Sequence, residues 1–442
     1  EQSALYTEEG ITVDKTMVVK AVSYTEGQYR SGVACASYIV NEGHKLPVIS
    51  VSLDYEDMYG YTTGIYVLGP GGQGQEFPYP GANFWKDWEK EAQIDFFEDG
   101  GGFSEKCGIK IFGQYGRAET KKSFQINFKD MYGCSELLYD VFAGANGDIM
   151  GYKSLVLRSG SQDYKSAMLR DEFFTSLLAS GSDSVYVQAY RPCVLYINGE
   201  YFGVYYIREK VNEDYVAQHL NVPPESATLL QANYTEVYGS NAEYRQLLDY
   251  VQNNDMTDPK HYQYVMQRID ALSLIDFTIG EIYSGNQDTG NVKFFKSSDP
   301  SSDGKWRWIY YDLDWAFYYD TRISFYLDPQ GRPGFRYINT MISSLLKNDE
   351  FRDMFLQRFA YHLKNTFSVK NAQAVLDAIV EQIEPEMQRE CERWNRTYSG
   401  WQNHVQTVRD KIETRVTLML SQLSSEFGLT QEEYDSYFGD IV

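Results

Sequence analysis

Apolar residues follow a two-residue period in the first half of the chain and a helical period in the second half. Ile109 and Ile111, and then Phe124, Ile126 and Phe128, fall on period two, which predicts two strands that share an apolar face. Apolar residues at helical spacing predict helices at 165–180, 214–220, 241–252, 259–268, 271–283, 338–347, 350–367, 372–394 and 401–427. The pattern therefore predicts an α+β fold with a β-rich first half and a helical second half.

Turn sequences join two pairs of β runs. The dipeptide Asn198-Gly199 lies between two such runs and suits a type I′ hairpin turn. The aromatic runs 292–296 and 306–311 flank a segment of Ser, Asp, Pro and Gly, which is turn chemistry. We expect an antiparallel hairpin at both places.

Acidic and amide residues stand at the open end of the second hairpin. If its two runs pair along their whole extent, Asp288 and Asn291 come near Asp312 and Asp314. An extended backbone would point the side chains of Asp312 and Asp314 the same way, because they are two residues apart. The resulting cluster of hard oxygen ligands would suit a divalent metal ion and leave one carboxylate as a base. The alternative is that these residues only cap helices and fill turns.

Composition narrows the classes of partner. The 442 residues carry 62 acidic and 40 basic side chains, a net charge of −22. Such a chain repels phosphate backbones and anionic membranes, so we expect no nucleic-acid partner. An anion site would need local cations of its own.

Metal-binding motifs and membrane spans are both missing from the sequence. The five cysteines and five histidines are scattered without zinc spacing, which argues against structural zinc. No run approaches the roughly 18 apolar residues of a membrane span. The chain opens at Glu1 rather than Met, so we expect a trimmed or mature fragment.

Charged residues mark three further candidate positions. Arg117, Lys121 and Lys122 lie in the loop that joins the two predicted strands, where they form either a phosphate cradle or a solvated basic turn. Arg170, on the helix predicted at 165–180, could pair with a strand residue, hold a phosphate or face solvent. Glu209 lies where a strand gives way to a helix. The glycine-rich stretch 69–75 lacks the Lys-Ser/Thr of a phosphate loop, so we expect a surface loop there.

The chain resembles two known families. Residues 1–42 resemble part of the C-terminal β module of chitobiases and hexosaminidases, which predicts a partial β-sandwich. Five segments, in order, resemble the spore-coat protein H (CotH) kinase family of atypical secreted protein kinases: GIKIFGQYGRAETKKSFQINF, LVLRSGSQDYKSAMLRDEFF, VLYINGEYFGVYYIREKVNEDYV, GNQDTGNVKFF and WRWIYYDLDWAF. The resemblance implies a kinase-like fold of two lobes, a β-rich lobe at 43–210 and a helical lobe at 211–442.

The second resemblance also implies residue roles. Lys122 or Lys121 would neutralise ATP phosphates with Arg117 close by, and Glu209 would lie near the nucleotide at the lobe junction. Arg170 is a further candidate for the nucleotide. Asp288 would hold the catalytic position and Asp312 would bind the metal, with Asn291 and Asp314 assisting. The family often has Trp where this chain has Gln287 and Tyr311, and the chain lacks HRD and DFG motifs.

These roles predict an ATP-dependent protein kinase that uses Mg²⁺ or Mn²⁺. Its acceptors would be Ser, Thr or Tyr hydroxyls of extracellular, spore-coat or cell-surface proteins, and of the chain itself. The oligomeric state is left open, with a monomer as the working expectation. One alternative is a non-catalytic coat or glycan-binding protein. Another is a glycosidase in which Asp288 and Asp312 are acid and base, but that interpretation leaves the Lys and Arg cluster without a purpose.

Overall fold

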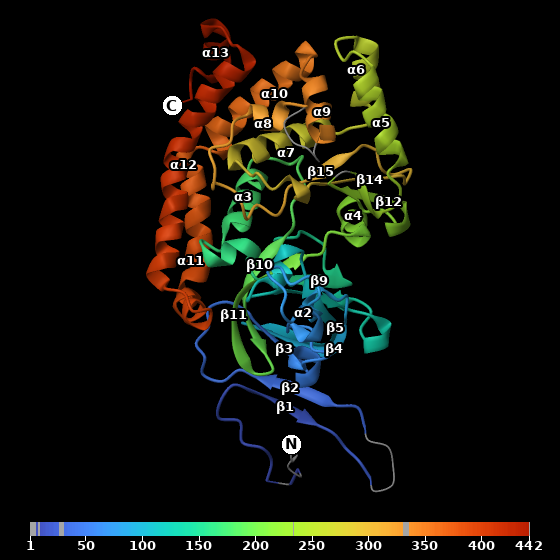
Figure 1. The fold of residues 1–442 in the computed structure, drawn as a ribbon, viewed down its shortest axis with the longest axis vertical. Coiled ribbons are helices and arrows are strands. Elements are labelled where there is room, and N and C mark those ends of the chain that lie inside the picture. Colours follow the sequence, from blue (N-terminus) through green and yellow to red (C-terminus); the bar gives the residue numbers. More distant parts are fainter. Residues whose placement is uncertain (1–5, 8, 26–30, 233, 330–335, 442) are drawn as a thin grey trace. The chain divides into compact units, whose positions relative to one another are not determined.

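The computed structural model describes residues 6–7, 9–25, 31–232, 234–329 and 336–441 (Figure 1). The chain divides into two compact units that interleave along the sequence. The strand unit consists of Glu1–Ser161, Arg191–Arg208 and Gln382–Tyr398, and the helical unit of Gln162–Tyr190, Glu209–Glu381 and Ser399–Val442. The domain boundaries expected from the sequence stay a prediction.

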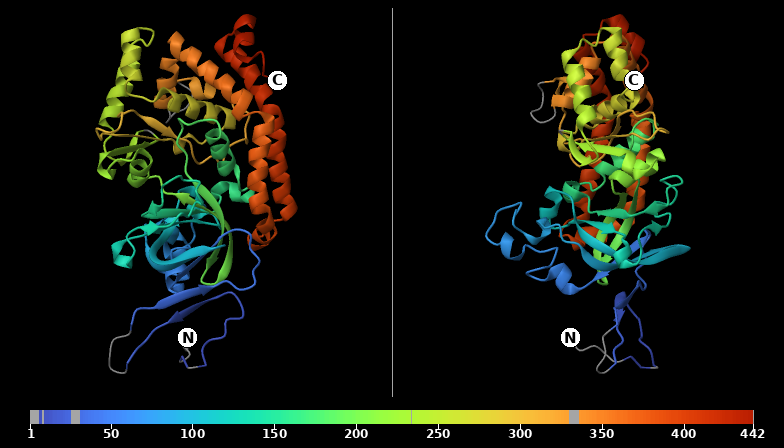
Figure 2. Two further views of the ribbon diagram at one scale, coloured as in Figure 1. Left: turned by 180° about the vertical axis from the view of Figure 1, so that it is seen from behind. Right: turned by 90° about the vertical axis from the view of Figure 1, so that its right-hand side faces the viewer.

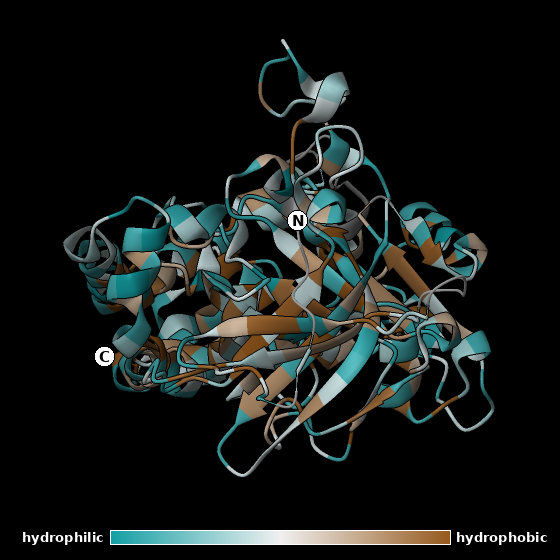
Figure 3. Cartoon of the chain, turned by 90° about the horizontal axis from the view of Figure 1, so that it is seen from below, coloured by the Kyte–Doolittle hydropathy of each residue, from teal (hydrophilic) through white to brown (hydrophobic). Residues whose placement is uncertain are grey.

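A closed barrel forms the core of the strand unit. Its strand order is β10-β11-β9-β6-β5-β4-β3. The strands are β3 (Val48–Leu53), β4 (Lys90–Glu98), β5 (Gly101–Phe112), β6 (Ser123–Asn127), β9 (Ser154–Arg158), β10 (Tyr190–Ile197) and β11 (Glu200–Glu209). A parallel pairing of β10 with β3, which sets Val194 opposite Val48, closes the barrel. Hydrophobic stretches run along many of the strands in Figure 3.

The barrel confirms the two period-two strands. β5 and β6 are antiparallel, with Ile109 opposite Ile126 and Ile111 opposite Phe124. All four side chains are buried, so the alternation does mark one apolar face. The β10–β11 turn is also as expected, because Asn198 and Gly199 have φ of 52° and 82°, as a type I′ turn requires.

Short elements decorate the barrel, namely α1 (Tyr55–Tyr59), α2 (Gly69–Gly72), β7 (Leu137–Leu138) and β8 (Gly151–Tyr152). The stretch 69–75, expected to be a surface loop, is exposed at five of its seven residues, but it contains the short helix α2, which buries Gly69 and Gly72. Gly69 has φ +62°, and a Cβ on it would lie 2.0 Å from the Asn83 side chain. These glycines therefore serve close packing.

Two strands precede the barrel. β1 (Met17–Ala21) and β2 (Ala34–Tyr38) form an antiparallel pair with Met17 opposite Tyr38. Figures 1 and 2 show this pair outside the barrel. The backbone N–H of Ser37 donates to Asp95 of β4 at 3.0 Å, which fastens the pair to the unit.

A four-stranded sheet lies within the helical unit, in the order β13-β12-β14-β15. Its strands are β12 (Ala227–Gln231), β13 (Thr235–Tyr238), β14 (Lys293–Ser297) and β15 (Arg307–Ile309). Phe295 and Ile309 pack on one face with Tyr215 of α4 (Glu213–Leu220). On the other face, Phe294 meets Tyr244 of α5 (Ala242–Asn253) at 4.3 Å between ring centroids. The sheet is therefore covered on both sides.

Helices make up most of the remaining helical unit: α3 (Arg170–Ala179), α6 (Pro259–Met266), α7 (Ala271–Ser284), α8 (Ser324–Leu327), α9 (Arg336–Leu345), α10 (Asp349–Tyr361), a π turn (His362–Thr366), α11 (Val369–Arg393), α12 (Tyr398–Phe427) and α13 (Gln431–Phe438). All residues of α7 from Ser273 onwards are buried. The β-rich first half and helical second half confirm the α+β prediction. Within the described residues, no helix has the length and apolar character needed to cross a membrane.

Candidate active site

The hairpin of β14 and β15 carries the acidic residues to one end of the sheet. The strands are antiparallel, with Lys293 opposite Ile309 and Phe295 opposite Arg307. This register sets the segment before β14 beside the segment after β15, as the sequence predicted. Asp288 and Asn291 lie on the first segment, and Asp312 and Asp314 on the second.

Asp312 and Asp314 join Asp171 in one cluster. One carboxylate oxygen from each of the three residues lies within 4.8 Å of the others. Asp171 and Asp314 are buried and Asp312 is half-buried. The expectation of an extended backbone is wrong, because Asp312 has φ +63°. Residues other than Gly, Asn and Asp rarely adopt this left-handed backbone conformation.

A buried loop determines where Asp171 lies. Asp163 accepts the backbone N–H groups of Leu169 and Arg170 at 2.9 and 3.0 Å and forms an ion pair with the Arg170 side chain. These bonds start α3 at Arg170, five residues later than the predicted helix start at Lys165. Asp171 therefore lies in the first turn of α3. The backbone N–H of Gln162 donates to Asp314 at 3.2 Å, so the same loop also holds a second carboxylate.

Asp288 and Asn291 form a pair in the loop after α7. The side-chain amide of Asn291 donates to Asp288 Oδ2 at 3.1 Å. Asn286 orients this loop, since its Oδ1 accepts the Asp288 N–H at 3.0 Å and its amide donates to Glu281 at 3.2 Å. Asp288 and Asp312 both raise the pKa of Tyr311, after burial as the main cause, so both act on that one phenol.

The cluster of Asp171, Asp312 and Asp314 fits Mg²⁺ or Mn²⁺ by its chemistry. Three carboxylates supply only oxygen donors, the type that these hard cations prefer. Three negative charges at this spacing repel one another strongly in a partly buried place. A divalent cation would relieve that repulsion.

Two proposed nucleotide residues of the helical unit are buried and bound to neighbouring side chains. Arg170 is bound to Asp163, and its guanidinium lies 4.4 Å from the centroid of the Tyr318 ring. Glu209 accepts the Ala189 N–H at 2.8 Å and lies 2.9 Å from Nε2 of His219. Both side chains are therefore held firmly in place.

The three remaining basic candidates belong to the strand unit. Arg117 Nε donates to the Gly113 carbonyl at 2.5 Å. Lys121 is fully buried and pairs with Glu390 at 2.6 Å, whereas Lys122 Nζ lies 4.1 Å from the centroid of the Phe84 ring. Burial lowers the pKa of Lys122 to about 8. Adjacent in sequence, the two lysines thus have different surroundings.

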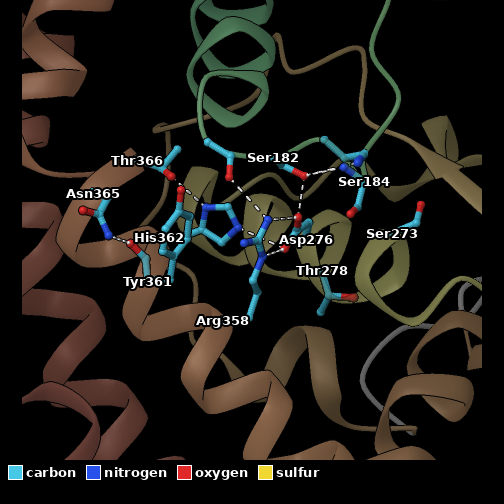
Figure 4. Close-up of polar contacts among 12 residues, drawn as sticks. Ser182, Ser184, Ser273, Asp276, Thr278, Arg358, Tyr361, His362, Asn365 and Thr366 are labelled. Carbon is cyan, nitrogen blue, oxygen red and sulfur yellow. Dashed lines mark hydrogen bonds and ion pairs between the residues drawn. The ribbon is translucent and has the colours of Figure 1, made fainter.

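The helix that leads to Asp288 is anchored from inside the helical unit. Asp276 of α7 accepts hydrogen bonds from Arg358 of α10 at 2.6 and 2.7 Å, and it also binds the Ser182 hydroxyl (Figure 4). His362 Nε2 lies 3.0 Å from Asp276, and its Nδ1 lies 2.9 Å from the Thr366 hydroxyl. Because Asp276 offers only acceptors, Nε2 carries the proton and Nδ1 accepts from Thr366.

Sequence reasoning missed Asp171. It named Arg170 on the helix predicted at 165–180 but gave the next residue no role. An available signal was that Asp171 shares one quoted family segment with Arg170. Its partner Leu313, which donates a backbone N–H to Asp171 Oδ1 at 3.0 Å, lies 142 residues away, and no local pattern reports such a contact.

Comparisons with known proteins place the chain in a family. No curated protein sequence matches it. Among the solved structures, the crystal structure of the golgi casein kinase is similar, with 13% sequence identity, a TM-score of 0.25, and coverage of 77% of this chain and 73% of that chain. The family model described as CotH kinase protein matches residues 109–419, most of the chain. The chain therefore belongs to the CotH kinase family.

Proposed function

We propose that this protein is an ATP-dependent protein kinase that transfers the γ-phosphoryl group to a protein hydroxyl. The observation that carries the proposal is the cluster of Asp171, Asp312 and Asp314 within 4.8 Å, formed at the end of the hairpin whose other segment bears Asp288. Membership of the CotH kinase family supports the same chemistry.

Each acidic group has a distinct role in this proposal. Asp288, oriented by Asn286 and Asn291, accepts the proton as the acceptor hydroxyl oxygen bonds to the γ-phosphorus. The bond from the γ-phosphorus to the bridging oxygen breaks, and ADP leaves with that oxygen. Asp171, Asp312 and Asp314 hold Mg²⁺ or Mn²⁺, with Asn291 as a further candidate ligand. When bound, the metal neutralises charge on the phosphates.

Cations of the chain bind the nucleotide in this proposal. Lys122 or Lys121 neutralises phosphate charge, with Arg117 nearby, and Glu209 lies near the nucleotide. Arg170 can bind phosphate only if it gives up its ion pair with Asp163.

The proposed acceptors are hydroxyl groups of protein side chains. Ser, Thr or Tyr hydroxyls of extracellular, spore-coat or cell-surface proteins, and of this chain, are the proposed acceptors. The net charge of −22 favours acceptors with basic surroundings, because acidic ones would be repelled.

Incorporation of labelled γ-phosphate tests the proposal. The full chain is incubated with labelled ATP, with Mg²⁺ or Mn²⁺ and with generic protein substrates, and Asp288→Ala and Asp312→Ala are compared with wild type. Wild type should label substrate or itself, both variants should lose at least about 100-fold in rate, and chelation should abolish labelling. Equal labelling by all three proteins would reject the roles. Absence of labelling, together with no metal-dependent thermal shift by ATP, would favour the non-catalytic alternative.

A further inference from the structure

Lys293 lies on the hairpin of β14 and β15, which also leads to the candidate metal ligands Asp312 and Asp314. It is the first residue of β14 and is paired in register with Ile309, the last residue of β15. Side chains alternate along a strand, so Lys293 shares the face of Phe295, the face that α4 covers. Its ammonium nitrogen lies 4.8 Å from the centroid of the Tyr311 ring.

The surroundings of Lys293 are charged on two sides. Its charge interacts with that of Lys210, which precedes α4, and with that of Asp312 of the metal cluster. The side chain is half-buried. Lys210 and Asp312 are therefore the charged side chains that act on the Lys293 ammonium.

No carboxylate of the described residues lies within ion-pair distance of the Lys293 ammonium. Lys296, three residues later on the same strand, pairs with Glu243. A partly buried ammonium without a counter-ion is costly, and the cost falls when an anion binds. In a chain of net charge −22, a cation left without an acidic partner indicates an anion site.

We propose that Lys293 binds a phosphate oxygen of the nucleotide, an inference that rests on the proposed kinase function. A lone carboxylate ligand is disfavoured here, because Asp171, Asp312 and Asp314 would repel it. A polyphosphate carries the divalent cation that the three aspartates need, and it presents further anionic oxygens to a neighbouring ammonium. This end of the hairpin therefore has carboxylates that would bind the metal ion and an ammonium group that would bind the phosphate accompanying that ion.

Nucleotide affinity tests the inference. The full chain is titrated calorimetrically with ATP, ADP and adenosine in the presence of Mg²⁺, as wild type and as Lys293→Ala, Lys293→Arg and Lys296→Ala. Lys293→Ala should raise the Kd for ATP by about tenfold or more, because a charge-assisted hydrogen bond is lost. Its Kd for adenosine should not change. Lys293→Arg should stay within about threefold of wild type, since it keeps the charge. The control Lys296→Ala should match wild type.

The three ligands locate the contact and separate the ways of failing. A Kd increase for ATP alone assigns Lys293 to the γ-phosphate, and an increase for ATP and ADP assigns it to an inner phosphate. An unchanged Kd for ATP in Lys293→Ala, or equal losses for ATP and adenosine, would overturn the inference. If wild type itself binds no ATP, the proposed kinase function fails. If wild type binds and transfers phosphate but Lys293→Ala behaves identically, only the role of Lys293 fails.

Discussion

The backbone N–H of Leu313 donates to Oδ1 of Asp171 at 3.0 Å, across 142 residues of sequence. This hydrogen bond ties the first turn of α3 to the segment between Asp312 and Asp314. It holds the third carboxylate against the two that follow the hairpin. Asp171 therefore has two separable properties, a hydrogen-bond acceptor for the backbone and a negative charge for the cluster.

Asp171→Asn should separate these two properties. The amide oxygen can still accept from Leu313, so the free energy of unfolding should change little, whereas the lost charge should raise the Kd for Mn²⁺ by at least about tenfold. Calorimetric titration with Mn²⁺ and denaturant unfolding measure the two effects. Asp183→Asn removes an exposed carboxylate outside the cluster and is the matched control. Undiminished Mn²⁺ affinity in Asp171→Asn would remove Asp171 from the proposed ligand set.

The left-handed backbone of Asp312 predicts an order of stability among its variants. At φ +63°, Asn and Gly are tolerated, whereas Ala should cost about 1 kcal/mol relative to Gly. Denaturation midpoints should therefore fall from Asp312→Gly and Asp312→Asn to Asp312→Ala. All three variants should lose the stabilisation that Mn²⁺ gives wild type. Equal stability of Asp312→Ala and Asp312→Gly without metal would contradict a left-handed backbone at position 312.

Local patterns were sufficient for the elements that build the hairpin end of the site. The aromatic runs predicted β14 and β15, and the antiparallel register brought the expected segments together. The helix before them was also predicted, and Asp270 and Gly285 cap its two ends as their residue types suggest. Asp312 and Asp314 do cluster, although the left-handed backbone, not an extended one, brings them together.

Features that depend on distant contacts could not be predicted in this way. The start of α3 is decided by Asp163, whose carboxylate accepts two backbone N–H groups and overrides the helical pattern that begins at Lys165. Strands β12 and β13 lie in the half that was predicted to be helical apart from one hairpin, and β12 is stabilised by pairing with β14 more than 60 residues later. Burial of Lys121 against Glu390 likewise joins residues 269 positions apart.

The contrast between Lys121 and Lys122 predicts how each substitution affects the strand unit. Lys121→Ala leaves Glu390 buried without its ion-pair partner and should cost about 3–5 kcal/mol of unfolding free energy. Lys122→Ala removes a hydrogen bond to the Glu119 carbonyl and packing on Phe84, which should cost about 1–2 kcal/mol. The difference in unfolding free energy is measured from the denaturant midpoints of the two variants. The comparison requires that the slope of the free energy against denaturant concentration is unchanged.

Activity of the two lysine variants can be interpreted once their stabilities are known. Loss of labelling in Lys122→Ala at near-normal stability would assign the phosphate contact to Lys122. Glu390→Gln, which keeps the shape of the acid but not its charge, is the control for Lys121. Equal destabilisation by Lys121→Ala and Lys122→Ala would contradict the different surroundings described for the two side chains.

The buried Asp276 predicts a loss of stability in acid. Burial would raise the pKa of Asp276, but hydrogen bonds from Arg358 and His362 outweigh it and lower the pKa to about 2. The unfolded chain has the ordinary value of about 3.9 and takes up the proton first. The contribution of Asp276 to the free energy of unfolding is therefore complete above about pH 5 and declines as the pH falls towards about 2. At pH 3 it should be roughly 1 kcal/mol smaller than at neutral pH.

His362 changes stability in the same direction. Burial lowers its pKa despite the neighbouring Asp276, so its stabilising contribution as a neutral imidazole is present above about pH 6.5 and declines in acid. Denaturant unfolding of wild type, Asp276→Asn and the exposed-residue control Asp249→Asn from pH 7 to pH 3 measures the contribution of Asp276 together with its bond to His362. The stability gap between wild type and Asp276→Asn should narrow below pH 5, whereas Asp249→Asn should follow wild type. A gap that stays constant over this range would show that Asp276 is not held as a carboxylate by Arg358 and His362.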